Sequence, residues 1–96
     1  MKEIIWNQFD IAEEDGEDTI KDTAKTQFNE YQNNIEALTM LVMVINHKSW
    51  DHYQWGNDIL AELYADLYYE YYEQAIDYLE NENREEDLRY FIRTLD

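Results

Sequence analysis

Apolar residues recur along the first half of the chain at alternating spacings of four and three residues, which is the pattern of one helix face. The run starts after Thr19, which with Asp22 resembles a capping box that carries an acid at its fourth position. It continues through eight consecutive apolar positions: Ile20, Ala24, Phe28, Tyr31, Ile35, Leu38, Val42 and Ile45. The pattern predicts one long helix over about residues 19–47.

The second half of this predicted helix is apolar on all sides, from Leu38 to Ile45. A helix that is apolar all round is buried all round. Two arrangements meet this requirement: the segment runs through the middle of the fold, or it forms a self-association surface. In the second arrangement the chain is a homodimer held through Leu38, Leu41, Val42 and Ile45.

A second helix is predicted over about residues 58–80, with Asn57 or Asp58 as its N-terminal cap. Its apolar side consists of Leu60, Leu63, Leu67, Tyr71, Ala75 and Tyr78, widened by Tyr64, Tyr68, Tyr72 and Leu79. The polar residues at 81–83 end it. A short final helix over about residues 84–95 follows, with an inner face of Leu88, Phe91, Ile92 and Leu95.

Two segments give weaker patterns. Residues 1–17 fit either a short strand or one helical turn, and the acidic run at 12–18 around Gly16 is interpreted as a loop. Residues 46–56 are interpreted as a connection, with room for a short helix over 49–56 capped by Ser49. The prediction is an all-α fold in which residues 1–96 form a single domain, a small helical bundle.

The composition supports this fold class. The chain has 96 residues, no proline and only two glycines, so the usual turn formers of a sheet protein are missing. Its 45% hydrophobic and 16% aromatic content is too high for a disordered chain. The absence of cysteine fits a reducing cytoplasm, and neither a signal peptide nor an apolar run of membrane-spanning length is recognised.

Charge changes the picture most. The chain has 23 acidic and 7 basic residues, a net charge of −16. Within the second helix, six carboxylates follow one another at spacings of four, four, three, four and three residues, with no basic residue among them. At about 100° and 1.5 Å per residue they fall within an arc of about 80° and a length of about 27 Å. This acidic stripe consists of Glu62, Asp66, Glu70, Glu73, Asp77 and Glu80.

The stripe costs stability. Five pairs of its members are like charges three or four residues apart, and each opposes helix formation by about 0.2–0.5 kcal/mol. A face that served only solubility would have lysines between its acids, and the resulting opposite-charge pairs would stabilise the helix that the like-charge pairs of this stripe destabilise. Fixed negative charge at regular spacing is instead what a nucleic-acid backbone presents to a protein. An acidic surface of this kind is repelled by nucleic acid and by anionic membranes, so its natural partner is a basic protein surface.

Catalytic and metal-binding constellations are not recognised. Neither His47 nor His52 has a glutamate three residues before it, as helical di-iron sites require. A calcium loop with Gly16 at its sixth position would place Ile11 where an acidic ligand is needed. No cysteine nucleophile or phosphate-binding glycine pattern is present. We therefore expect no enzyme activity, catalytic residue, metal or cofactor.

Tyrosines are the second unusual feature, because six of the nine lie in the second helix. Their spacing assigns Tyr64, Tyr71 and Tyr78 mainly to the core. Tyr69 and Tyr72 are assigned mainly to the surface, where aromatic side chains between carboxylates suit a protein interface.

With its carboxylate rows, "ELYADLYYEYYEQAIDYLE" backed by "ENENREEDL", the chain resembles the small acidic DNA-mimic proteins of phages and mobile elements. These include the phage overcome-classical-restriction protein and several anti-CRISPR proteins. The resemblance is one of design and covers the second half of the chain plus the acidic run "AEEDGED". It implies an inhibitor, working in the cytoplasm of a bacterial host, that occupies the DNA-binding groove of a defence nuclease. The implied contacts are the acidic stripe with Tyr69 and Tyr72, extended by Glu82, Glu85, Glu86 and Asp87.

Two alternatives stay open. An antitoxin-like or regulatory module would bind another basic protein through a hydrophobic hot spot more than through the stripe. A structural or oligomerisation module would use residues 38–45 as its interface, and its acids would only keep it soluble.

Overall fold

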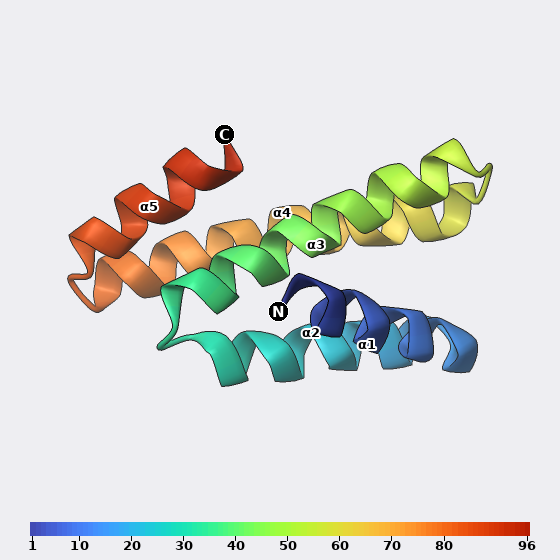
Figure 1. Ribbon diagram of the computed structural model, residues 1–96, viewed down its shortest axis with the longest axis horizontal. Coiled ribbons are helices and arrows are strands. Elements are labelled where there is room, and N and C mark those ends of the chain that lie inside the picture. Colours follow the sequence, from blue (N-terminus) through green and yellow to red (C-terminus); the bar gives the residue numbers. More distant parts are fainter.

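The computed structural model describes residues 1–96 and contains five α-helices and no strand (Figure 1). The predicted all-α class is confirmed. The helices are α1 (Lys2–Asp15), α2 (Glu17–Tyr31), α3 (Ile35–Gln54), α4 (Asp58–Asn81) and α5 (Glu85–Leu95). None of them combines the length and the hydrophobicity that crossing a bilayer requires.

Helix α3 is the centre of the bundle, because it contacts each of the other four helices. It pairs with α4 as a long antiparallel hairpin, and α1 and α2 lie along one side of this hairpin (Figure 1). Helix α5 folds back at the end of the hairpin where α4 ends (Figure 1). The apolar segment of α3 lies in the middle of the fold, where its four predicted dimer contacts are fully buried within the single chain: Leu38, Leu41, Val42 and Ile45. These side chains are core residues and leave no surface for a homodimer contact.

The prediction of one helix over 19–47 is wrong, because the chain reverses direction between Tyr31 and Ile35. Asn34 adopts an extended backbone conformation and its Oδ1 accepts a hydrogen bond of 3.2 Å from the amide of Ala37, which caps α3. On the other side of the break, the guanidinium of Arg84 donates a 2.7 Å hydrogen bond to the carbonyl of Gln32. The apolar spacing hid this turn because it continues in phase across it.

The N-terminal segment is neither a strand nor a single turn. It forms a helix of 14 residues whose inner positions, Ile5, Phe9 and Ala12, follow the helical spacing and are buried. The acidic run at 12–18 is not a loop either, since Gly16 alone separates α1 from α2. Gly16 has φ 110°, a conformation open to glycine at little cost, and its amide donates to the carbonyl of Ala12.

The predicted connection over 46–56 is mostly helix. Helix α3 continues to Gln54, so no separate short helix exists there, and Gly56 with φ 79° lies in a brief turn. Ser49 does not cap a helix: its hydroxyl donates to the carbonyl of Ala61 on α4 at 2.7 Å. The side chain of Asn57 caps α4 through the amide of Leu60, as predicted, and the predicted bounds of α4 and α5 hold to within one residue at each end.

Candidate functional site

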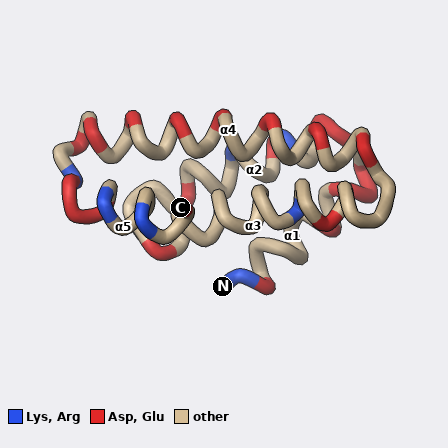
Figure 2. The backbone as a smooth tube through the Cα atoms, turned by 90° about the horizontal axis from the view of Figure 1, so that it is seen from above, with Lys and Arg blue, Asp and Glu red and all other residues tan.

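All six stripe carboxylates are exposed. Acidic positions recur along the outer edge of α4 (Figure 2). The opposite face of α4 fixes this orientation, because it is buried against the bundle through Leu63, Leu67, Tyr71, Ala75 and Leu79. Helix α4 has 24 residues and runs along the 39 Å long axis of the molecule. The stripe therefore lies along the outer edge for most of the length of the protein.

The stripe carboxylates are free of intramolecular ion pairs. The ion pairs in the structure involve Lys48, His52, Arg84 and Arg89, and none of these reaches the stripe. The one side-chain hydrogen bond to the stripe is a 3.4 Å contact from Gln74 to Glu70. A partner can therefore bind these negative charges without first breaking an internal ion pair.

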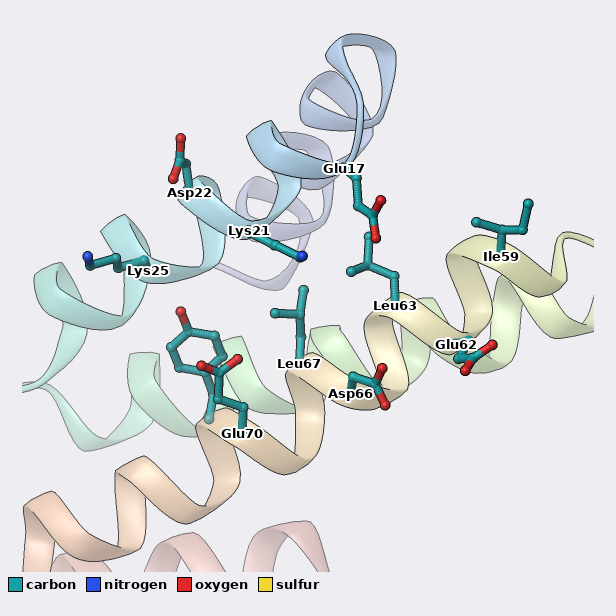
Figure 3. Close-up of a pocket in the computed structure, with 11 residues that line it drawn as sticks. Glu17, Lys21, Asp22, Lys25, Ile59, Glu62, Leu63, Asp66, Leu67 and Glu70 are labelled. Carbon is teal, nitrogen blue, oxygen red and sulfur yellow. The ribbon is translucent and has the colours of Figure 1, made fainter.

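A groove of about 650 Å³ separates one flank of the stripe from α2 (Figure 3). Glu62, Asp66 and Glu70 line its α4 side, and the α2 side carries two lysines and two acids, Lys21, Lys25, Glu17 and Asp22. Glu17 and Asp22 on the same side of the groove offset the charge of the two lysines, and neither lysine is within 4 Å of a stripe carboxylate oxygen. Sequence reasoning missed the two lysines because they belong to another helix.

The predicted extension of the stripe toward the C-terminus is interrupted by arginines. Glu82, Glu85 and Glu86 are exposed. Asp87 is half-buried and accepts from both Nε and Nη2 of Arg84 at 2.8 Å. A partner would therefore meet less free negative charge at α5 than along α4.

The tyrosines divide largely as predicted. Tyr64 and Tyr71 are buried, and Tyr78 is half-buried with its hydroxyl donating to Oδ1 of Asn33 at 3.0 Å. Tyr69 is 68% exposed. Tyr72 is half-buried, because its ring packs 5.4 Å from that of Phe91 on α5.

Tyr68 lies between Tyr69 and Tyr72, with ring centroids 5.6 and 5.8 Å away, so the three form a continuous aromatic edge beside Glu73. Burial is the main cause that raises the pKa of Tyr68 and Tyr72, and nearby ionisable groups raise it further. Both hydroxyls therefore stay protonated and able to donate a hydrogen bond.

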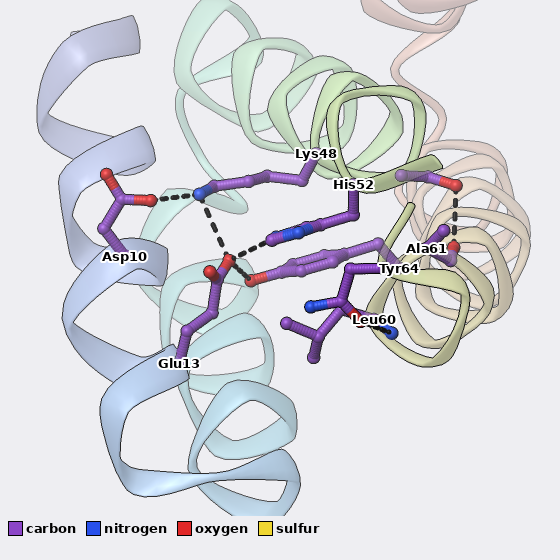
Figure 4. A network of polar contacts seen from close by, with 9 residues as sticks. Asp10, Glu13, Lys48, His52, Leu60, Ala61 and Tyr64 are labelled. Carbon is purple, nitrogen blue, oxygen red and sulfur yellow. Dashed lines mark hydrogen bonds and ion pairs between the residues drawn. The ribbon is translucent and has the colours of Figure 1, made fainter. Parts of the chain in front are cut away.

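A polar network that the sequence reasoning missed lies under α1 (Figure 4). Lys48 of α3 is 2% exposed, forms an ion pair with Asp10 and lies 3.1 Å from Oε2 of Glu13. The same Glu13 oxygen accepts a 2.6 Å hydrogen bond from the hydroxyl of Tyr64 and lies 3.0 Å from Nε2 of His52. The ammonium of Lys48 also lies 4.4 Å from the centre of a Trp6 ring. The available signal was the position of Lys48, three residues after Ile45 on the apolar face of the helix.

This network links α1, α3 and α4 through their side chains. Burial acts to raise the pKa of Glu13, but hydrogen bonds from Tyr64, His52 and Lys48 outweigh burial and the pKa is lowered. No group of three or more histidines and acids has an arrangement that could hold a metal ion. Comparison with protein-family models, curated protein sequences and solved structures finds no match to this chain.

Proposed function

We propose that this protein is a DNA mimic that occupies the nucleic-acid-binding groove of a host defence enzyme, either a CRISPR effector nuclease or a restriction enzyme. The observation that carries the proposal is the acidic stripe: six exposed carboxylates, free of ion pairs, in one row on one continuous helix. The protein acts by occupying the groove and needs no chemistry of its own.

Rigidity is what makes the stripe effective. The carboxylates stand on a helix that is anchored along its whole length by buried side chains, so little backbone freedom is lost when a partner binds. A DNA-binding groove presents Lys and Arg side chains that are placed to receive phosphates. Carboxylates meet them with charge-assisted hydrogen bonds, and the opposite potentials speed the encounter.

The spacing of the stripe carboxylates also supports a DNA-binding groove as the partner surface. Each turn of α4 contributes a carboxylate about every 5.4 Å, whereas one DNA strand carries a charge about every 3.4 Å of axis. The stripe is thus sparser than a phosphate strand but of the same sign, over about 27 Å. It can engage several cations of a groove together, which makes the affinity fall steeply as salt rises.

The test is a DNA-cleavage assay with purified restriction enzymes and CRISPR effector nucleases. In the stripe triple variant, Asp66, Glu70 and Glu73 are all replaced by Gln. In the matched control triple, Glu3, Glu30 and Glu36 are replaced by Gln; these are exposed acids on other helices, so the net charge changes equally. We expect wild type and the control to inhibit one of the nucleases, in competition with duplex DNA, and the stripe triple to lose inhibition. Equal inhibition by the two triples would show that the stripe is not the contact surface.

One observation favours the alternative, an antitoxin-like or regulatory module that binds another basic protein through an apolar hot spot. Trp50, Tyr53, Trp55 and Ile59 are each at least 65% exposed near the α3–α4 turn. A complex of that kind would survive high salt and an excess of duplex DNA, whereas the complex of a DNA mimic would dissociate in both. The oligomerisation alternative has no such support, because residues 38, 41, 42 and 45 are core.

A further inference from the structure

An exposed aromatic site lies at the N-terminal end of the stripe. Trp50 and Tyr53, on the last turns of α3, are 65% and 66% exposed and pack edge to face with ring centroids 6.2 Å apart. Together with Ala61 and Ala65 of α4 they line a groove of about 430 Å³. We call this groove the aromatic pocket.

The fold does not require these two rings at the surface. Both lie outside the hydrophobic core and outside the set of apolar side chains that pack against it. Large apolar side chains gathered on a surface and bordered by polar groups mark interaction sites. In a chain with a net charge of −16, two adjacent exposed rings therefore point to a binding role.

The charge around the pocket identifies what would fill it. Asp58 and Glu62 belong to its lining, whereas no lysine or arginine does. The hydroxyl of Ser49, also in the lining, is already engaged with the carbonyl of Ala61. The pocket thus offers aromatic rings and two carboxylates, the combination that attracts a cation carried on an apolar stem.

We propose that the aromatic pocket accepts an arginine side chain of the basic partner protein. Arginine fits better than lysine because its planar guanidinium stacks on an aromatic ring and pairs with a carboxylate in the same plane. In this arrangement the guanidinium lies against Trp50 or Tyr53 and donates to Asp58 or Glu62. This inference rests on the proposed function, because it assumes a partner with a basic groove.

Glu62 connects the pocket to the stripe, since it lines the pocket and is also the first stripe carboxylate. The connection matters because the stripe nearly repeats itself. A partner shifted by one helical turn, about 5.4 Å, would meet almost the same row of charges. An arginine held at one end removes this ambiguity, so the pocket sets the register in which the partner binds.

Other occupants of the pocket are disfavoured by charge. A second copy of this chain would bring its own acidic rim against Asp58 and Glu62, and like charges placed together are repulsive. An anionic membrane surface is repelled in the same way by a chain of net charge −16.

The test uses the ¹⁵N-labelled protein and two probes of equal charge, a hexa-arginine and a hexa-lysine peptide, at low salt. The chain has three tryptophans, so the indole N–H signals report Trp6, Trp50 and Trp55 separately. We expect both peptides to shift the backbone amides of the stripe, and hexa-arginine to shift the Trp50 indole far more than hexa-lysine does. The substitution Trp50→Ala should weaken hexa-arginine binding about two- to fivefold and leave hexa-lysine binding unchanged.

Trp55→Ala is the matched control, because Trp55 is 79% exposed in the same region but does not line the pocket. It should leave the affinity for both peptides unchanged. If the stripe amides shift while the Trp50 indole does not, the pocket proposal is overturned and the proposed function stands. Equal losses in the Trp50→Ala and Trp55→Ala variants would also overturn the pocket. If neither peptide shifts the stripe amides, both proposals fail.

Discussion

The hydroxyl of Tyr64 donates a hydrogen bond of 2.6 Å to Oε2 of Glu13 and so joins α4 to α1, although no Cα atoms of these two helices lie within 8 Å of each other. The contact depends on α3, which supplies His52 to stack on the Tyr64 ring at 5.6 Å and Lys48 to balance the charge of Glu13. One half-buried carboxylate thus connects the stripe helix to the N-terminal helix through side chains alone (Figure 4).

Tyr64→Phe should destabilise the fold by about 1.5–3 kcal/mol, because it removes a hydrogen bond to a charged group in a buried setting. The ring remains, so its packing against Phe9, at 5.7 Å, is kept. Urea denaturation followed by circular dichroism measures the change. Tyr69→Phe, at an exposed ring, should stay within about 0.5 kcal/mol of wild type. Equal effects of the two substitutions would mean that the Glu13 contact contributes nothing.

Lys48→Met should be more damaging, by about 2–4 kcal/mol, because it leaves Glu13 partly buried without its cation. The loss falls below that of a fully buried pair because Asp10 is half exposed and can turn to water. Adding Glu13→Gln to Lys48→Met should recover part of the stability, since the unpaired charge is then gone. If the double variant is no more stable than Lys48→Met alone, the loss of stability comes from altered packing around Trp6 and not from the unpaired charge of Glu13.

The Glu13 contacts should also make stability depend on pH. Because the pKa of Glu13 is lowered from its ordinary value of 4.5, the folded state favours the ionised form, and this stabilisation is complete above that value. It is lost as the pH falls through the lowered pKa. We therefore expect the difference in unfolding free energy between wild type and Glu13→Gln to be constant down to about pH 5 and to shrink below it. A difference that grows with acidification would contradict this.

Removing stripe charge should strengthen the fold while it weakens binding. The stripe triple variant, Asp66, Glu70 and Glu73 to Gln, eliminates four of the five like-charge pairs, so it should gain about 1–2 kcal/mol of stability. The control triple, Glu3, Glu30 and Glu36 to Gln, removes no pair of the stripe and should gain less. Urea denaturation of both variants and of wild type at low salt measures these differences in stability. A stripe triple that is less stable than wild type would show that these carboxylates make favourable contacts within the fold.

Parts of this structure follow directly from local sequence. Helix α4 is predicted to within a residue because its caps, apolar face and acids all agree, and the exposure of the stripe follows from the same periodicity. The turn at Asn34 was missed because apolar positions continue in phase across it. Only the capping side chain marks the break, and asparagine also occurs inside helices.

Other parts depend on contacts between helices and have no local signal. Lys48 is buried only because Asp10 and Glu13 of α1 meet it there, and the sequence around these two acids has only a weak helical pattern. The two lysines beside the stripe, Lys21 and Lys25, are brought there by the packing of α2 near α4. The aromatic pocket likewise needs both α3 and α4, since α3 supplies its two rings and α4 its two carboxylates.

The central position of α3 has a consequence for how the molecule opens. Because α3 touches every other helix, its amides can exchange with solvent only when most of the bundle comes apart, whereas α5 contributes a single fully buried side chain, Phe91. Hydrogen exchange should therefore be slowest in α3 and fastest in α5. Helix α4 has buried side chains near both ends of the stripe, Leu63 beside Glu62 and Leu79 beside Glu80, so local opening of α5 should leave the row of carboxylates in place.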